Sequence, residues 1–235
     1  MLKVSNQPDG SPEIFFSVQG EGVNIGVPAI FLRLGVCNLR CSWCDTKYTW
    51  DWENYSYEDE VREMSSVEIE ECIKKFNCKH VVITGGEPLL QARQLEPLAG
   101  SLKNQGYFIE VETNGTIVPT HEFSNSVDQW NVSPKLENSG NSTKSRESRP
   151  ALEYFANRSN AYFKYVVESQ SDVDEVVALN SKYTIAATKT LLMPQATDEV
   201  DLVQKSRTLV ERCQEEGFRF STRLHVLLWG IKRGI

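Results

Sequence analysis

Short apolar runs alternate with amphipathic segments along most of the chain. The apolar runs are rich in β-branched and aromatic residues, which favours β-strands. They lie at 13–18, 29–34, 80–84, 107–113, 129–133, 162–167 and 190–193. The segments between them predict helices near 89–104, 148–157, 171–180 and 198–216. A further helix should follow Ser65, because Ser65 and Glu68 have capping-box spacing and the apolar residues after them share one helix face.

This order of strands and helices is typical of a parallel sheet with right-handed crossovers. Six strand-helix units fit an open partial barrel better than a closed eight-unit barrel, whose usual length is about 250 residues. The sequence therefore predicts an α/β fold, an open partial (β/α)6 barrel related to the TIM barrel, in one domain over 1–235.

Two segments depart from this pattern. The stretch near 47–65 is polar and acidic with interspersed Tyr and Trp, and we expect either a small inserted element or a solvated acidic loop. The stretch near 137–149 has no large apolar residue, so we expect a mobile loop, at least without a ligand.

Composition narrows the classes of protein that remain. The chain has 235 residues, 40% of them hydrophobic, which is enough for one α/β domain with a substantial core. A formal net charge of −7 argues against an extended face for nucleic acid. We expect no membrane segment and a cytoplasmic location, because no apolar run reaches the roughly 18 residues of a spanning helix and no signal peptide is evident.

Three cysteines, Cys37, Cys41 and Cys44, follow the strand at 29–34 with Cys-x3-Cys-x2-Cys spacing. Three thiolates on one loop can bind three irons of a [4Fe–4S] cluster and leave the fourth iron open to another ligand. A structural zinc site needs a fourth Cys or His, and the nearest candidates, Cys72 and Cys78, lie beyond the polar insert. Zinc or unliganded thiols remain alternatives. Cys72, Cys78 and Cys213 are expected as small core residues.

Several predicted strands end in segments whose polar or charged side chains could bind a ligand. They are Thr84-Gly-Gly-Glu87, Glu112-Thr-Asn-Gly115, Ser133-Pro-Lys135, Lys164-Tyr-Val166 and Met193-Pro-Gln195. Each alone is compatible with an ordinary turn or strand terminator. Ligands of parallel sheets bind beyond the carboxyl ends of the strands, so five such segments behind a cysteine loop indicate a ligand site.

The cysteine loop and the Gly-Gly-Glu segment resemble the radical S-adenosylmethionine (SAM) superfamily. Together with Ser17-Val-Gln-Gly-Glu-Gly22, Cys44-Asp-Thr46 and the other strand-end segments, they closely resemble the 7-carboxy-7-deazaguanine synthase family, from about Ser17 to the C-terminus. The resemblance implies conversion of 6-carboxy-5,6,7,8-tetrahydropterin to 7-carboxy-7-deazaguanine with loss of ammonia, on the way to queuosine and archaeosine. It also implies a [4Fe–4S] cluster, SAM and Mg²⁺ as cofactors, a flavodoxin-like electron donor and a homodimer.

The same resemblance implies roles for individual residues. The cluster would be held by Cys37, Cys41 and Cys44. SAM would be bound by Gly86, Glu87, Thr113, Ser133, Lys135 and Gln195. The pterin would be bound by Gln19, Glu21, Arg33, Thr84 and His225. Mg²⁺ would be bound by Asp45 and Thr46, which offer hard oxygen ligands.

Simpler interpretations of these residues stay open. Arg33 fits an exposed strand residue, Asp45-Thr46 fits a turn cap, and His225 fits a hydrogen-bonded core or edge histidine. Two other classes of protein also remain. A glycyl-radical-activating enzyme shares the cysteine spacing, although Ser17–Gly22 and Cys-Asp-Thr argue against it. A non-catalytic zinc or iron–sulfur protein explains the cysteines but not the strand-end segments.

Overall fold

The computed structural model describes residues 1–235 and is built on one ten-stranded sheet. Nine strands follow the order β10-β9-β8-β7-β6-β5-β3-β1-β4, and β2 pairs with β3. All neighbours from β3 to β10 are parallel. The parallel strands are β3 (Pro28–Leu34), β5 (His80–Gly85), β6 (Phe108–Thr113), β7 (Gln129–Val132), β8 (Ala161–Val167), β9 (Thr190–Pro194) and β10 (Arg219–Phe220).

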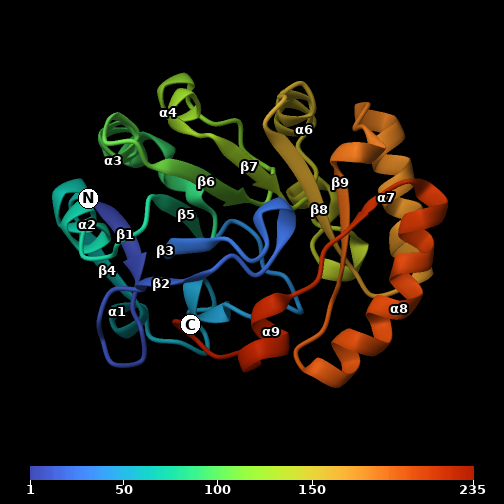
Figure 1. Cartoon of the computed structure of the whole chain (residues 1–235), viewed down its shortest axis with the longest axis horizontal. Helices are drawn as coiled ribbons and strands as arrows, with labels where there is room; N and C mark the ends of the chain where they lie inside the picture. Colours follow the sequence, from blue (N-terminus) through green and yellow to red (C-terminus); the bar gives the residue numbers. More distant parts are fainter.

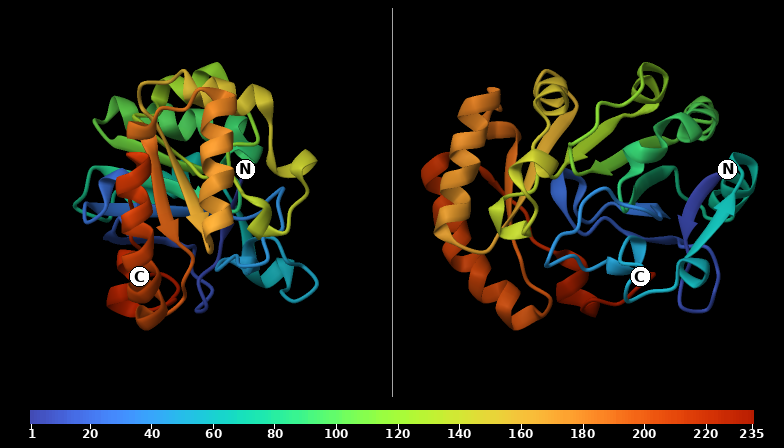
Figure 2. Two further views of the ribbon diagram at one scale, coloured as in Figure 1. Left: turned by 90° about the vertical axis from the view of Figure 1, so that its right-hand side faces the viewer. Right: turned by 180° about the vertical axis from the view of Figure 1, so that it is seen from behind.

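The helices cover the outer face of this sheet, and the sheet curves into an open arc (Figures 1 and 2). They are α2 (Ser66–Ile73), α3 (Ala92–Asn104), α4 (His121–Ser126), α5 (Thr143–Arg146), α6 (Arg149–Ala156), α7 (Gln170–Tyr183) and α8 (Glu199–Glu216). The six longer parallel strands, β3 and β5 to β9, form the predicted open partial (β/α)6 barrel. The fold prediction is confirmed, and α4 is a helix that the sequence pattern did not reveal.

The core lies between the sheet and the helices. Trp130 on β7 is fully buried and packs edge-on against Phe123 of α4, with ring centroids 5.9 Å apart. Its ring lies 5.2 Å from that of Phe155 on α6. Burial of large aromatic side chains dominates core energetics, so this cluster fixes two helices on the middle strands.

Capping sequences set the helix boundaries as expected. Ser65 accepts a hydrogen bond from the Glu68 amide, and the Glu68 carboxylate accepts one from the Ser65 amide, which is the predicted capping box of α2. Asp198 caps α8, and Gly217 ends it with a φ of 67°, in the left-handed region. The ends of these two helices are therefore partly determined by local sequence.

The 47–65 segment is not only a loop. It contains a 3-10 turn (Lys47–Thr49), α1 (Tyr57–Glu60) and β4 (Val61–Met64). β4 pairs antiparallel with β1 (Leu2–Ser5), and β1 in turn pairs with β3. β2 (Ile14–Val18) pairs antiparallel with β3. Together these strands extend the barrel sheet at its amino-terminal edge.

The 137–149 segment also has local structure, a 3-10 turn (Glu137–Ser139) and α5. The Arg146 side chain is buried and pairs with Glu175 at 2.7 Å. Asn138 donates to the Val166 carbonyl at 3.1 Å. These contacts hold the segment against β8 and α7, and its mobility without ligand stays a prediction.

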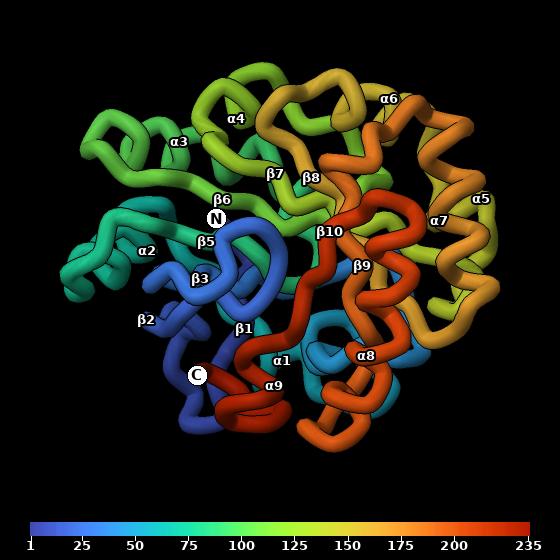
Figure 3. The backbone as a smooth tube through the Cα atoms, turned by 45° about the vertical axis from the view of Figure 1, so that its right-hand side comes forward, coloured from blue at the N-terminus to red at the C-terminus, as the bar shows by residue number.

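The chain ends inside the open side of the barrel. After β10 it forms α9 (Leu224–Trp229) and then runs back to the N-terminal strands (Figure 3). Arg233 donates to the Asn6 carbonyl and pairs with Glu60 at 2.7 Å. None of the helices is both long and apolar enough to cross a membrane.

Candidate functional site

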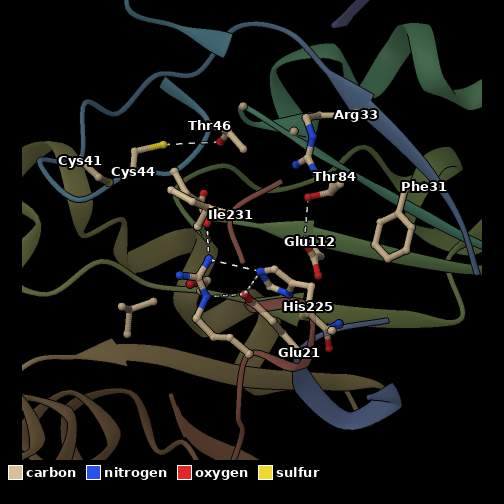
Figure 4. A pocket seen from close by; sticks show the side chains of 18 of the residues that line it. Glu21, Phe31, Arg33, Cys41, Cys44, Thr46, Thr84, Glu112, His225 and Ile231 are labelled. Carbon is tan, nitrogen blue, oxygen red and sulfur yellow. Dashed lines mark hydrogen bonds and ion pairs between the residues drawn. The ribbon is translucent and has the colours of Figure 1, made fainter. Parts of the chain in front are cut away.

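A cavity of about 280 Å³ lies at the carboxyl ends of the parallel strands (Figure 4). Every residue that the sequence predicted for the site lines this cavity, except Glu87. Segments from both ends of the chain therefore meet at one place. The roles of the individual residues remain proposals, but their grouping is a feature of the fold.

Each of the three loop cysteines accepts a hydrogen bond at its sulfur from a nearby N–H group. The Leu39 amide donates to Cys37 Sγ at 3.4 Å, and Asn141 Nδ2 donates to Cys41 Sγ at 3.3 Å. Trp50 Nε1 donates to Cys44 Sγ at 3.4 Å. N–H donors aimed at sulfur stabilise thiolates and tune iron–sulfur clusters. All six cysteines are free thiols.

Burial alone does not favour these thiolates. It raises the pKa of Cys37 to about 12 and also raises the pKa of Cys41. A metal cluster supplies the positive charge that deprotonates such groups, so the donor set fits an iron–sulfur cluster. No group of three His, Cys, Asp or Glu side chains is arranged closely enough to hold a single metal ion.

Gly85 and Gly86 pack their backbone directly against the start of the cysteine loop. A Cβ at Gly86 would overlap the carbonyl oxygen of Val36, and one at Gly85 would overlap the backbone of Leu34. Of these two glycines, Gly86 is expected to bind SAM. The structure gives a further reason for glycine here, because only glycine lets the loop come this close.

Val36, next to the first cysteine, has an unusual backbone conformation. Its φ is 76°, which is strained for a β-branched residue. Two hydrogen bonds hold it, from its amide to the Thr49 carbonyl at 2.7 Å and from the Glu87 amide to its carbonyl at 2.9 Å. Strain maintained by surrounding structure is typical of functional sites.

Glu87 differs from its expected place. Its carboxylate is fully buried and accepts hydrogen bonds from the Leu89 amide at 3.0 Å, Thr113 Oγ1 at 2.7 Å and the Asn114 amide at 2.7 Å. Burial raises its pKa, although these donors oppose the shift. The side chain therefore lies outside the cavity lining, where it joins the segment after β5 to the end of β6. Its role in SAM binding stays a prediction.

Glu21 is the centre of a charged network. Its carboxylate pairs with Lys164 of β8 and with Arg223 Nε at 3.1 Å, and His225 Nε2 lies 3.8 Å away. Burial opposes ionisation, but Lys164, Arg223 and His225 together hold the pKa of Glu21 well below its usual value. Burial lowers the pKa of His225. Figure 4 shows Glu21 and His225 pointing toward one another.

The sequence analysis did not assign roles to Lys164 or Arg223. Lys164 lies in one of the strand-end segments, which was a usable signal. Arg223 had none, because its partners are remote in sequence. It donates to the Ala196 carbonyl at 2.6 Å and also to Asp45. Thus one of the two predicted Mg²⁺ ligands has an oxygen engaged by an arginine, whereas Thr46 Oγ1 lies 3.5 Å from Cys44 Sγ.

Arg33 is paired inside the cavity rather than exposed. Its Nε donates to Glu13 at 2.7 Å, and Tyr48 donates to the same oxygen at 3.0 Å. Burial lowers the pKa of Arg33, but the nearby Tyr48 and Glu13 have the larger combined effect and raise it. Arg233 stacks on the Tyr48 ring at 3.4 Å and lies 3.5 Å from Glu13. Glu13, Tyr48 and Arg233 were missed because their identity as cavity residues depends on the fold.

Comparison with known proteins shows what this sequence and fold are similar to. The Radical SAM superfamily model matches residues 33–128. The curated 7-carboxy-7-deazaguanine synthase of Pyrobaculum aerophilum is 41% identical, covering 94% of this chain and 95% of that protein. The one of Halobacterium salinarum is 33% identical, covering 97% and 94%. The crystal structure of QueE from Escherichia coli matches with a TM-score of 0.69 and 29% identity, covering 95% of each chain.

A partial parallel barrel with three cysteines beside a Gly-Gly turn defines a radical SAM protein. Similarity over nearly the whole length of several relatives is more specific than this shared fold. The chain belongs to the 7-carboxy-7-deazaguanine synthase family.

The packing of Gly86 generates a prediction. Gly86→Ala should displace the cysteine loop, because the new Cβ would overlap the backbone of Val36 at the start of that loop. Iron bound after anaerobic reconstitution should fall by at least half. Gly100→Ala is the matched control, since no heavy atom lies within 4 Å of a Cβ there. Equal iron loading of the two variants would contradict the assigned role of the contact.

Proposed function

We propose that this protein is a carbon–nitrogen lyase that converts 6-carboxy-5,6,7,8-tetrahydropterin to 7-carboxy-7-deazaguanine with loss of ammonia, in deazapurine synthesis. The observation that carries the proposal is the single cavity in which the cysteine loop faces a second, charged set of side chains. Family membership supports the same reaction. The bound cluster and SAM supply the radical chemistry, and the chain's own residues position the reactants and exclude water.

The SAM part of the cavity is formed by Gly86, Thr113, Ser133, Lys135 and Gln195. Lys135 Nζ donates to Ser133 Oγ at 2.8 Å and lies 5.5 Å from the centroid of the Trp43 ring. An ammonium group beside the cysteines suits the carboxylate of SAM. Glu87 acts one step away in this proposal, because it holds Thr113 and the Asn114 amide in place.

The pterin part lies on the other side of the cavity. Arg33 provides the cation for the pterin carboxylate, and Gln19, Glu21, Thr84 and His225 provide partners for its amide and amino edge. Thr84 is held by Glu112, to which it donates at 2.7 Å. The C-terminal residues Ile231 to Ile235 line the same cavity and exclude water from it.

Mg²⁺ is proposed as a third cofactor at Thr46, with Asp45 beside it. One Asp45 oxygen accepts from Arg223, so the protein offers few free oxygens. Mg²⁺ requires octahedral coordination and keeps water until a ligand supplies oxygens. The substrate carboxylate would complete the site, and metal binding would depend on substrate.

The remaining proposals concern the oligomeric state of the protein, its electron donor and its location in the cell. A homodimer, a flavodoxin-like electron donor and a cytoplasmic location are expected from the family resemblance. No direct nucleic-acid ligand is proposed, because the chain carries a net charge of −7.

The cluster assignment is tested by removing its ligands. Replacing Cys37, Cys41 or Cys44 with Ala should abolish SAM cleavage and leave little bound iron, because the remaining thiolates cannot hold the cluster. The control variant Cys78→Ala should retain SAM cleavage and bound iron. Cys78 lies outside the cavity and donates to the Pro28 carbonyl. Finding zinc without iron after anaerobic reconstitution of the native protein would refute the proposal.

The pterin assignment is tested at Arg33. Arg33→Ala should weaken pterin binding by about 1.5–3 kcal/mol, the range for a hydrogen bond to a charged group, while SAM affinity is unchanged. The Arg33→Lys variant keeps the positive charge that offsets Glu13, so it should bind the pterin with intermediate affinity. Calorimetry of the loaded enzyme measures both ligands. Loss of SAM affinity with retained pterin affinity would reverse the assignment.

The Mg²⁺ proposal is tested at Thr46. Thr46→Ala should reduce the stimulation of turnover by Mg²⁺, and Thr46→Ser should preserve it because the hydroxyl remains. Metal affinity, measured by titration, should be poor without pterin. Equally tight Mg²⁺ binding with and without substrate, or unchanged stimulation in Thr46→Ala, would leave Asp45-Thr46 as a turn cap.

A further inference from the structure

A second carboxylate, outside the cavity lining, lies directly behind the pterin side of the site. Glu110 is on β6, one inward-facing position before Glu112, and is fully buried. No role for it follows from the sequence motifs, because it precedes the strand-end segment. Its surroundings nevertheless determine how a cavity residue is presented.

Glu110 is surrounded by nitrogen donors from several parts of the chain. Its Oε1 accepts from Gln19 Nε2 at 2.7 Å and from Asn131 Nδ2. Its Oε2 accepts from Asn24 Nδ2 at 2.7 Å, and His80 Nε2 lies 2.8 Å from the same oxygen. A carboxylate has about four lone-pair sites and no hydrogen to donate. All of its capacity is used by these partners, so they must turn nitrogen toward it.

This constraint decides the orientation of the Gln19 amide. Gln19 Nε2 donates to Glu110 and also to Glu112 Oε1 at 3.2 Å, which uses both of its hydrogens. Its Oε1 accepts only from the Glu21 amide, at 3.3 Å. An amide oxygen has two lone pairs, so one stays available to a ligand. Gln19 can therefore accept from a ligand but cannot donate to one.

Glu112 adds acceptors at the same place. It lines the cavity and accepts from Thr84 and Gln19. Figure 4 shows its side chain next to that of Thr84. With Gln19 Oε1, this part of the cavity wall presents acceptor oxygens, which match a ligand edge that carries N–H groups and disfavour one that carries carbonyl oxygens.

We propose that Glu110 is a positioning residue that locks the Gln19 amide, so that the site selects a pterin edge bearing N–H donors over an oxo edge. The inference rests on the proposed function and adds the origin of its specificity. Glu110 acts only through its amide partners, Gln19 above all, because it does not line the cavity. Replacing the 2-amino group of the pterin by oxygen should place carbonyl oxygen against acceptor oxygen.

The test exchanges acid and amide between the two positions. Gln19→Glu places a third carboxylate against Glu110 and Glu112, and it should weaken pterin binding at least tenfold. In the double variant, Gln19→Glu with Glu110→Gln, the amide introduced at position 110 can donate to the carboxylate introduced at position 19. The second oxygen of that carboxylate still faces the cavity. The double variant should therefore recover most of the lost affinity and keep the preference for the amino edge.

The measured quantities are dissociation constants of the loaded enzyme, with SAM present. The probes are 6-carboxy-5,6,7,8-tetrahydropterin and its 2-oxo analogue, and variants are compared at matched iron content. Recovery in the double variant with the amino preference retained supports the proposal. Failure to recover, or recovery with the oxo analogue preferred, overturns it. Equal binding of both probes by the native enzyme also overturns it, whereas binding of neither probe means that the proposed pterin function fails instead.

Discussion

The partly buried carboxylate of Glu21 makes the interactions on which the site depends. It joins three parts of the chain, since its partners are Lys164 in the barrel and Arg223, which is 202 positions away in sequence. Removing one member of a buried charged group leaves another charge uncompensated, which costs more than a surface pair. The Leu224 amide also donates to the Gly20 carbonyl at 2.8 Å, so backbone contacts support the same junction. The open side of the barrel is thereby closed around the cavity.

A second constraint connects this junction to the cysteine loop. Gly85 and Gly86 let the loop backbone pack on β5, and Val36 is held there in a strained conformation. Asp45, directly after the third cysteine, accepts from Arg223. The cysteine loop and the Glu21 network are thus linked through one arginine. A displacement of either side is transmitted to the other through contacts that have little freedom, because packed interiors deform poorly.

The sequence was sufficient for the barrel and for the grouping of the predicted site residues other than Glu87 in one cavity, for identifiable reasons. Parallel strands are marked by apolar runs, and their carboxyl ends must hold the ligand groups, so Thr84 and Ser133 could be found locally. β1 and β4 are short and are stabilised by pairing with each other, which no local pattern records. Glu87 lies outside the cavity lining for a different reason. Its motif fixes its position in the chain, but the side chain turns to the donors of β6 instead of the cavity.

The arrangement also explains how an acidic protein can bind an anionic substrate. The net charge of −7 repels anions at long range, but exposed charges are screened within about 8 Å at physiological ionic strength. Inside the cavity, Arg33 pairs with the buried carboxylate of Glu13, and Arg233 lies beside the same carboxylate and also pairs with Glu60. Arg33 uses only its Nε in this pairing, so the donors of its two terminal nitrogens are left for a further acceptor. An incoming carboxylate can accept from them without displacing Glu13, so affinity at this point is determined by local hydrogen bonding and not by the overall charge.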